Sequence, residues 1–483
     1  MSTSNTVHPT TSNSETLSRW NKIAYAVGEI GYATGPGTVI PFWYTIFLTD
    51  IAQLDLRLVS LFWLVVTVWD AVNDPLIGFL SDRTRTRWGR RRPYLLLGAV
   101  PFGVTFALLW LVPTVESQAV LFAYYTVVYI LFEAMFTAVS CPYVALTPEL
   151  TQDHDERTSL VTYRMAFNIG ASLAAPLLFG LVVFPMFPAR DPRAFRVIGF
   201  ICGAISIPPF LIAFLATRER PEFQEESALP LWESLRFVLR NVAFRYTLAI
   251  RILSWMPVVI AQAVFAYFLI YWTGLTEDET SLVQGVIMAM ALLFLPVVLW
   301  LSRRLEKKTA YVIAAASWAF VMLAILLVPQ GAKAPAYVIA ALAGFGVSAA
   351  HLLPRAMEPD VLEVDELMSG RRQEGAYTGV AVFVDKLARA LILGLLPAVL
   401  YWSGYVQPTP ADPIPPQPAS ALRALQLLIS VLPALLLAAS ILVAQRYPIT
   451  RQRYAEIHRK LVARRQRSKA RVADVRVLGH SEH

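Results

Sequence analysis

The chain has 483 residues, of which 56% are hydrophobic and only 16% are charged. This composition excludes a soluble globular protein of the same length, which would be less apolar and carry more charge. The formal net charge of +8 does not indicate a nucleic-acid partner, because the basic residues lie mainly in short segments between long apolar stretches.

Residues 1–18 are rich in Ser, Thr and Asn and lack a basic segment followed by a short apolar core, so we predict a disordered tail and not a cleavable signal. Twelve apolar stretches follow, each close to or above the roughly 20 residues that cross a bilayer. The predicted spans are residues 23–49, 57–80, 94–112, 119–146, 160–184, 197–216, 245–273, 282–301, 310–328, 337–355, 377–402 and 422–444. We therefore predict an all-α integral membrane protein of about twelve transmembrane helices.

A polar, charged segment divides the twelve spans into two groups of six. The predicted domains are a six-helix bundle at residues 19–217, a cytoplasmic linker at 218–243, a second six-helix bundle at 244–446 and a basic tail at 447–483. Two bundles of six spans around a central pathway are typical of secondary transporters. Gly35, Pro36 and Gly37 interrupt the first span, and broken helices in transporters free backbone groups near binding sites.

Basic segments lie on one side of the predicted spans, at Arg83–Arg92, Arg303–Lys308 and Arg446–Arg471. Because Lys and Arg concentrate in cytoplasmic loops, we expect both termini in the cytoplasm of a multi-pass plasma (inner) membrane protein. The three arginines within residues 190–196 lie on the other side and are an exception.

The remaining residue types limit the chemistry. Cys141 and Cys202 both lie in apolar stretches, so we expect no disulfide, no thiolate metal site and no cofactor. Aromatic rings near predicted span ends are expected at the membrane interface: Trp43, Tyr44, Trp272, Tyr401 and Trp402.

The second span carries the strongest functional signal. Asp70, Asn73 and Asp74 are spaced three and four residues apart, so they share one face of a helix inside the membrane. Two carboxylates this close cannot both remain charged in a low dielectric unless a cation or a proton lies between them. The sequence predicts a coupling-ion site, with a structural ion pair to Arg or Lys as the alternative.

The segment Asp70–Pro93, with its basic loop after the span, resembles the loop between helices two and three of the major facilitator superfamily. Within that superfamily it is similar to the glycoside, pentoside and hexuronide cation symporters, the group of melibiose permease. A second segment, Pro359–Lys386, is similar to the same group's tenth-to-eleventh loop and helix eleven. The resemblance extends over all twelve spans and implies the two-bundle fold of the superfamily.

The resemblance implies roles for individual residues. It places the coupling cation at Asp70, Asn73, Asp74 and Thr137, and makes Lys386 the link between cation and substrate. It places substrate near Glu29, Tyr32, Ser140, Arg164 and His351. It implies a gating role for Asp82, Arg90, Arg91 and Arg92 in the loop after the second span.

The sugar site departs from that of melibiose permease. Ala33 and Ser140 stand where that protein has carboxylates, and Val144 and His351 stand where it has tryptophans. Melibiose is therefore not the expected substrate. Glu29, in the segment Gly28–Gly31, resembles the helix-one acid of many relatives and is the candidate on the substrate side.

Structural roles remain as alternatives for several of these residues. Arg164 is also expected to be able to pair with Glu133, and Lys386 with its neighbour Asp385. His351 is one polar group in an apolar span, which more often is a hydrogen-bonded core residue than a proton carrier.

We expect a cation-coupled symporter for a small polar solute, a glycoside or sugar, with sodium or a proton as coupling ion. A sodium-coupled lysolipid or other non-sugar transporter is the second interpretation. The sequence lacks the His cluster or nucleophile motif of a membrane enzyme. Asp70, Asp74 and Lys386 argue against a sensor that has lost transport. The expected partners are membrane lipid, the solute and the cation, and the expected state is a monomer.

Overall fold

The computed structural model describes residues 17–151, 154–217, 236, 238–369, 374–409 and 411–448, with residues 456 and 459. At some of these positions, Asp82 among them, only the backbone is described. Most of the predicted tails and linker lie outside these ranges.

The N-terminal half forms six membrane crossings. The first consists of α1 (Arg19–Ala26), α2 (Gly28–Thr34) and the π-helices η1 (Gly35–Tyr44) and η2 (Phe47–Ile51). The others are α3 (Leu56–Arg83), α4 (Arg92–Leu109), α5 (Gln118–Leu150), α6 (His154–Leu178) continued by η3 (Phe179–Val183) and η4 (Phe184–Met186), and α7 (Pro192–Ala216).

The C-terminal half forms six more crossings. They are α9 (Val242–Tyr267) continued by η6 (Phe268–Trp272), α10 (Glu277–Arg304), α11 (Lys307–Ala324) with η7 (Ile325–Leu327), α12 (Ala334–Ser369), α13 (Glu374–Trp402), and α14 (Ala419–Ile429) followed by α15 (Val431–Gln445). The described helices follow the predicted spans closely, except that α12 continues well beyond residue 355. The all-α, two-bundle prediction is confirmed.

Ten of the described helical segments are long and apolar enough to span a membrane by length and composition. The first crossing is outside this set. It is divided into short helices, and its Pro36 and Pro41 cannot donate backbone hydrogen bonds. Helix α13 is outside it because Asp385, Lys386 and Arg389 fall within one apolar stretch. The two helices that fail a simple hydropathy test are thus those with interrupted backbone or intramembrane charge.

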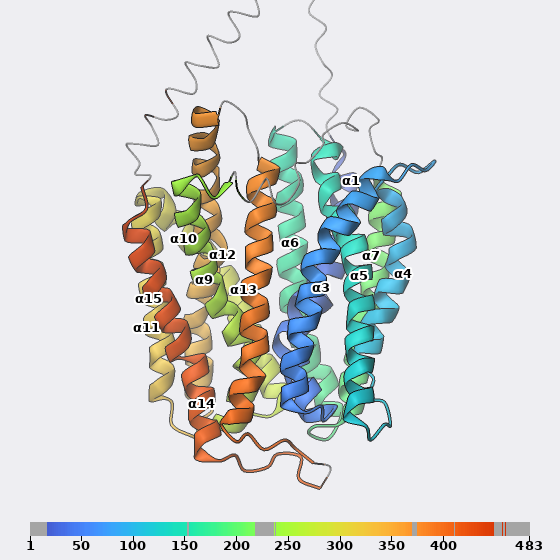
Figure 1. Ribbon diagram of the computed structural model, residues 1–483, viewed down its shortest axis with the longest axis vertical. Helices are drawn as coiled ribbons and strands as arrows, with labels where there is room; N and C mark the ends of the chain where they lie inside the picture. Colours follow the sequence, from blue (N-terminus) through green and yellow to red (C-terminus); the bar gives the residue numbers. More distant parts are fainter. Residues whose placement is uncertain are drawn as a thin grey trace, which may run out of the picture.

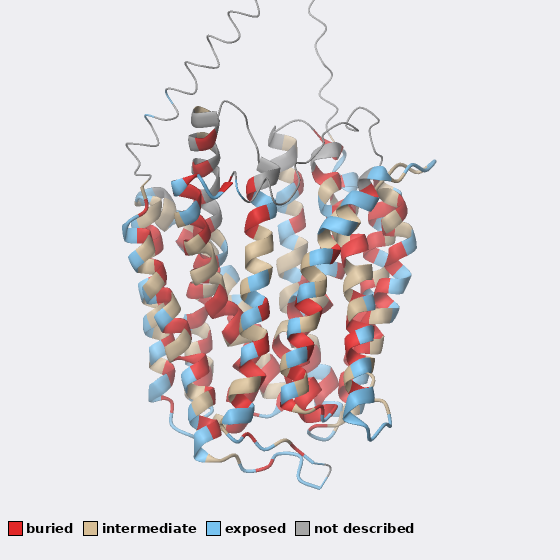
Figure 2. Cartoon of the chain, in the orientation of Figure 1, coloured by how far each residue is buried: buried red, intermediate tan, exposed pale blue. Residues whose placement is uncertain are grey.

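The two bundles lie side by side, with α3 packed along α13 and α6 packed against α10 (Figure 1). Large apolar side chains such as Phe320 and Leu327 are exposed, as expected for a surface that contacts lipid. Exposed and buried positions alternate along many of the helices (Figure 2). We call the end where α1 begins at Arg19 and α3 ends at Arg83 the basic end, and the opposite end the distal end.

Helices within the N-terminal bundle pack through small residues and rings. A Cβ atom on Gly103 of α4 would lie 2.5 Å from the backbone oxygen of Gly203 on α7, so only glycine permits this close crossing. Trp43 and Tyr44 are buried among other aromatic rings. Their predicted place at the membrane interface is therefore wrong, because η1 turns both rings towards the protein interior.

Candidate functional site

A charged group joins the two bundles where α3 lies along α13. Lys386 Nζ on α13 donates to Asp70 Oδ1 and to Asp74 Oδ2 on α3, at 2.6 Å each, and also contacts the Asp70 backbone oxygen at 3.2 Å. The two acids are one helical turn apart, so a single ammonium reaches both. One ammonium and two carboxylates leave this group with one net negative charge if both acids are ionised.

Neighbouring oxygen atoms surround these acids. Thr137 Oγ1 on α5 donates to Asp74 Oδ1 at 3.2 Å. The Asn73 side chain is buried and its amide donates to the Glu133 backbone oxygen at 3.0 Å. The structure therefore brings Asp70, Asp74 and Thr137 together, while the Asn73 amide nitrogen points to α5 and leaves its oxygen for another partner.

The alternative predicted from the sequence, a structural ion pair to Arg or Lys, is present in this state, and Lys386 is the cationic partner. Asp385 pairs instead with Arg251 on α9, with its Oδ2 2.8 Å from both Nε and Nη2, so the predicted alternative of a local Asp385–Lys386 pair is wrong. The Asp74 side chain keeps 37% of its surface exposed. An ion can therefore approach the pair from the solvent side.

Glu133 on α5 is an additional acid near the Asp70–Asp74–Lys386 group, and it is not among the residues predicted there from the sequence. Its carboxyl lies within electrostatic range of Asp70, Asp74 and Lys386, and it is hydrogen bonded to Tyr129. Its spacing of four residues before Thr137 on α5 is the signal that could have identified it, because i and i+4 share a helix face. Glu133 adds a third acid beside the coupling-ion candidates.

A second charged group lies inside the N-terminal bundle, between α2 and α6. Arg164 Nε donates to Glu29 Oε1 at 2.7 Å, and Arg164 Nη2 is 2.5 Å from the same oxygen. Asn168 Nδ2 donates to Glu29 Oε2 at 2.9 Å. Arg164 therefore pairs with Glu29, and the predicted alternative of an Arg164–Glu133 pair is wrong.

Aromatic and hydroxyl groups complete this second group. Arg164 Nη1 donates to Thr147 Oγ1 at 2.8 Å, and the guanidinium lies 4.9 Å from the centroid of the Tyr143 ring. Tyr25 and Tyr143 bond reciprocally, each hydroxyl donating to the other residue's backbone oxygen. A carboxylate, a guanidinium, an amide and two tyrosines are the groups that orient a polar ligand.

The other predicted substrate residues are spread over both bundles. The Tyr32 ring is 38% exposed and lies 5.4 Å from the Phe136 ring, and Ser140 is half-buried on α5. His351 on α12 is exposed and meets the Trp255 ring at 4.6 Å, while its Nδ1 lies 2.8 Å from the Val347 backbone oxygen. Neither of these two contacts involves the Glu29–Arg164 group.

The predicted gating arginines lie at the basic end. Arg91 Nη1 donates to the Ala145 backbone oxygen at 2.5 Å, and Arg92 donates to the Phe214 backbone oxygen from Nη2 at 2.8 Å. Both contacts stay within the N-terminal bundle. Arg90 is half-buried in the same loop, and the Asp82 side chain lies outside the described residues.

The fold and these intramembrane charges define a transporter of the major facilitator type. The nucleoside transporter NupG has the same fold, with a TM-score of 0.63 at 11% identity over 88% of this chain and 98% of that chain. A family model described as MFS/sugar transport protein matches residues 24–451. The chain belongs to this family.

Two relatives add to this assignment. The chain is 31% identical to a symporter of Synechocystis sp. over 94% of this chain and 98% of the relative. It is 28% identical to the sodium-dependent lysophosphatidylcholine symporter 1-A of Danio rerio over 90% of this chain and 87% of the relative. The resemblance to symporters of the major facilitator superfamily, drawn from Asp70–Pro93 and Pro359–Lys386, is confirmed.

Proposed function

We propose that the protein is a cation-coupled symporter in which Asp70 and Asp74 bind the coupling ion. The observation that carries this proposal is the ammonium of Lys386 held 2.6 Å from a carboxylate oxygen of each acid. The lysine occupies the position that a sodium ion or proton would take between two carboxylates. Because it comes from the other bundle, binding of an ion there acts on the contact between α3 and α13.

The charge balance supports an exchange between lysine and cation. With either Lys386 or one monovalent cation between them, the two acids retain one net negative charge, so the exchange leaves the charge of the site unchanged. Thr137, the Asn73 oxygen and the carboxylates supply the oxygen ligands that a hard cation prefers. The Asn73, Asp74 and Thr137 roles are proposals that rest on this arrangement.

We assign substrate to the Glu29–Arg164 group, with Tyr32 and Ser140 nearby in the N-terminal bundle and His351 on the facing one. Paired hydrogen-bonding groups beside aromatic rings are typical of sites for glycosides and sugars. A glycoside or sugar is therefore the first candidate substrate, and the family model's description as sugar transport agrees with it.

A lysolipid is the second candidate, because the lysophosphatidylcholine symporter matches nearly the whole chain. Its headgroup, like a sugar, would need charged and polar partners such as Arg164 and Glu29. The exposed apolar side chains of Val144 on α5 and Met165 on α6 offer contact for an acyl chain. In the inner membrane, the basic end is proposed to face the cytoplasm.

A thermal-shift measurement on purified protein tests both parts of the proposal, because a ligand that binds the native state raises the melting temperature. The probes are a panel of methyl glycosides and lysophosphatidylcholine below its micellar concentration, each with and without sodium and at two pH values. We expect a stabilising ligand whose effect grows with sodium or with added protons. Stabilisation by ligands that never depends on either cation would contradict cation coupling.

A further inference from the structure

A buried charged cluster at the distal end is separate from the groups described above. Arg190 Nη2 is 2.9 Å from Asp50 Oδ2, and the Arg190 backbone N–H donates to Glu277 Oε2 at 3.3 Å. Arg190 Nη1 lies 3.6 Å from Glu277 Oε1. None of the three residues is more than 7% exposed. Charges are rarely buried to this degree unless they are paired.

Tyrosine hydroxyls surround the Asp50 carboxylate. Tyr271 donates to Oδ2 at 2.7 Å, and Tyr405 donates to both oxygens at 2.9 Å. Thr49 lies 2.6 Å from the Tyr267 hydroxyl. Burial, followed by the charge of Asp50, raises the pKa of Tyr405 well above its usual range, so this hydroxyl remains a donor. We call these residues, with Asp50, Arg190 and Glu277, the distal cluster.

The distal cluster connects the two halves of the molecule. Asp50 on η2 and Arg190 before α7 belong to the N-terminal bundle, whereas Glu277 and the three tyrosines belong to the C-terminal bundle. The Asp50–Arg190 pair therefore stays within one bundle, and the bonds to Glu277, Tyr271 and Tyr405 cross between bundles. Separation of the bundles at this end must break the crossing bonds.

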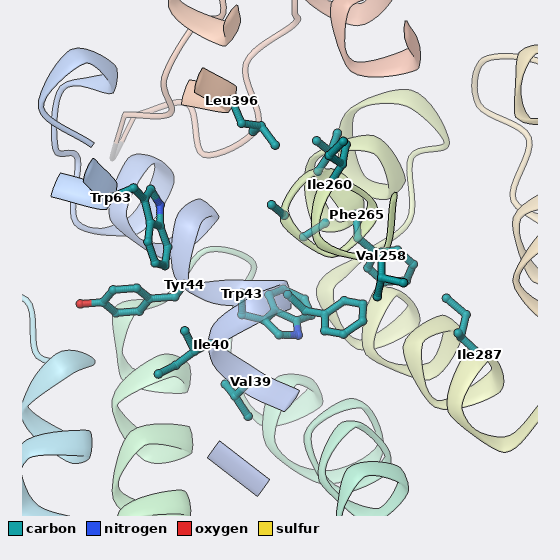
Figure 3. Close-up of a cluster of buried hydrophobic side chains, with 14 of the residues drawn as sticks. Val39, Ile40, Trp43, Tyr44, Trp63, Val258, Ile260, Phe265, Ile287 and Leu396 are labelled. Carbon is teal, nitrogen blue, oxygen red and sulfur yellow. The ribbon is translucent and has the colours of Figure 1, made fainter. Parts of the chain in front are cut away.

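An apolar layer lies next to the distal cluster, towards the middle of the membrane. Trp43 lies between η1 and the side chains of Val258 and Phe265 on α9 (Figure 3). Its indole N–H donates to Gln284 Oε1 on α10 at 3.2 Å, which is another bond between bundles. Polar and apolar contacts together close the distal end in this state.

We propose that the distal cluster is the gate that holds the distal end closed, an inference that rests on the proposed transport function. When the bundles separate, Asp50 keeps Arg190 as its partner, so no uncompensated charge remains in the N-terminal bundle. Glu277 then faces the water that enters. The crossing bonds stabilise the closed state alone, and their loss shifts the equilibrium towards the open one.

A buried cysteine can report this opening. Ser281 follows Glu277 by one helical turn and is 0% exposed. It lies at the bundle interface, because a Cβ atom on Gly180 of η3 would be 3.1 Å from the Ser281 Cβ atom. Its hydroxyl has no hydrogen-bond partner among the described residues, so Ser281→Cys loses no bond. With Cys141 and Cys202 replaced by alanine, the rate of modification by a water-soluble methanethiosulfonate measures how often the interface opens.

We expect Glu277→Gln and Tyr405→Phe each to increase this modification rate about tenfold, the factor expected for loss of one hydrogen bond to a charged group. Asp191→Asn is the matched control. Asp191 pairs with Arg193 at 2.7 Å at the distal end, but both residues belong to the N-terminal bundle, so this pair does not cross between bundles. Its rate should stay within about twofold of the parent. Unchanged rates in both cluster variants, or an equal increase in Asp191→Asn, would overturn the gate.

Loss of folding is distinguished by a second reporter. Cys202 on α7 is 0% exposed, and α7 packs mainly against α4 and α2 of its own bundle. In a variant that retains Cys202 as its single thiol, Glu277→Gln should leave this residue unreactive. A reactive Cys202 would show that the cluster maintains the fold and not the gate. Neither readout needs substrate or cation, so the result does not depend on whether coupled transport is found.

Discussion

Gln53 and Gly274 occupy equivalent positions at two matching helix ends and share a left-handed backbone, with φ of 56° and 71°. The two segments share a pattern: Phe47-Leu48 precedes Gln53-Leu54, and Phe268-Leu269 precedes Gly274-Leu275 at the same spacing. Ala52 N donates to Phe47 O, and Thr273 N donates to Phe268 O, which closes the same wide turn in each bundle. The two bundles therefore repeat one local structure beside the distal cluster.

The first prediction follows from this equivalence. Gly274→Ala should lower the free energy of unfolding by about 1 kcal/mol, because a side chain disfavours positive φ. A Cβ atom there would meet no other atom within 4 Å, so the effect comes from the backbone. Gln53→Gly should act in the opposite direction and raise the thermal unfolding midpoint. A midpoint that rises in Gly274→Ala would contradict the strain argument.

The second prediction concerns the lysine between the acids. Lys386→Gln leaves Asp70 and Asp74 without their ammonium, so the variant should unfold at a lower temperature. Its stabilisation by the coupling cation should exceed that of the parent, with affinity tighter by about tenfold, because no lysine has to be displaced. Titration of the melting temperature with sodium and with protons measures this. Arg251→Gln, which breaks the neighbouring pair to Asp385, should show no such gain.

The third prediction separates a substrate role of Glu29 from a structural one. Glu29→Gln removes the charge that pairs with Arg164 and should weaken substrate binding by at least about tenfold at saturating cation. Lys22→Gln is the matched control, because the Lys22–Glu156 pair, at 2.8 Å, also joins the first crossing to α6. Both variants lose stability, but only the first should lose affinity. Calorimetry measures the substrate affinity of both variants. If Glu29→Gln binds substrate as tightly as Lys22→Gln, the Glu29–Arg164 pair has a structural role alone.

The fourth prediction concerns orientation. Reporter fusions after Arg92, within residues 218–240 and after Arg446 should all report the cytoplasm, because basic loops remain on that side. A fusion after Ala334, at the distal end, should report the opposite side. A fusion that reports the wrong side at any of these places would contradict the twelve-crossing topology.

Much of the fold was predictable because its main determinant is local. Runs of apolar residues long enough to cross a bilayer form helices wherever they occur, since the backbone has no other hydrogen-bond partners in lipid. The extension of α12 to Ser369 was missed because its last turns are polar and carry no membrane signal. Burial of Trp43 was missed because it depends on the π-helical turn of η1, which no hydropathy pattern encodes.

The candidate sites divide in the same way. The spacing of Asp70 and Asp74 on one helix identified their group, and family resemblance added Lys386, which is distant in sequence. The distal cluster was missed because its members come from five separate segments. Arg190 gave a signal, as a basic residue on the side where few are expected. Its acidic partners became visible only when the bundles were assembled.

Coupling between the acids and transport is the central claim, and uptake into vesicles tests it most directly. The measurement is accumulation of substrate with and without an imposed sodium or proton gradient, in the parent and in Asp70→Asn and Asp74→Asn. Each variant removes one of the two charges that hold the cation, so binding of the cation should no longer raise the affinity for substrate. The account predicts that both variants exchange substrate down its own gradient but do not accumulate it. Gradient-driven accumulation that persists in both would contradict symport and leave a facilitator or an exchanger.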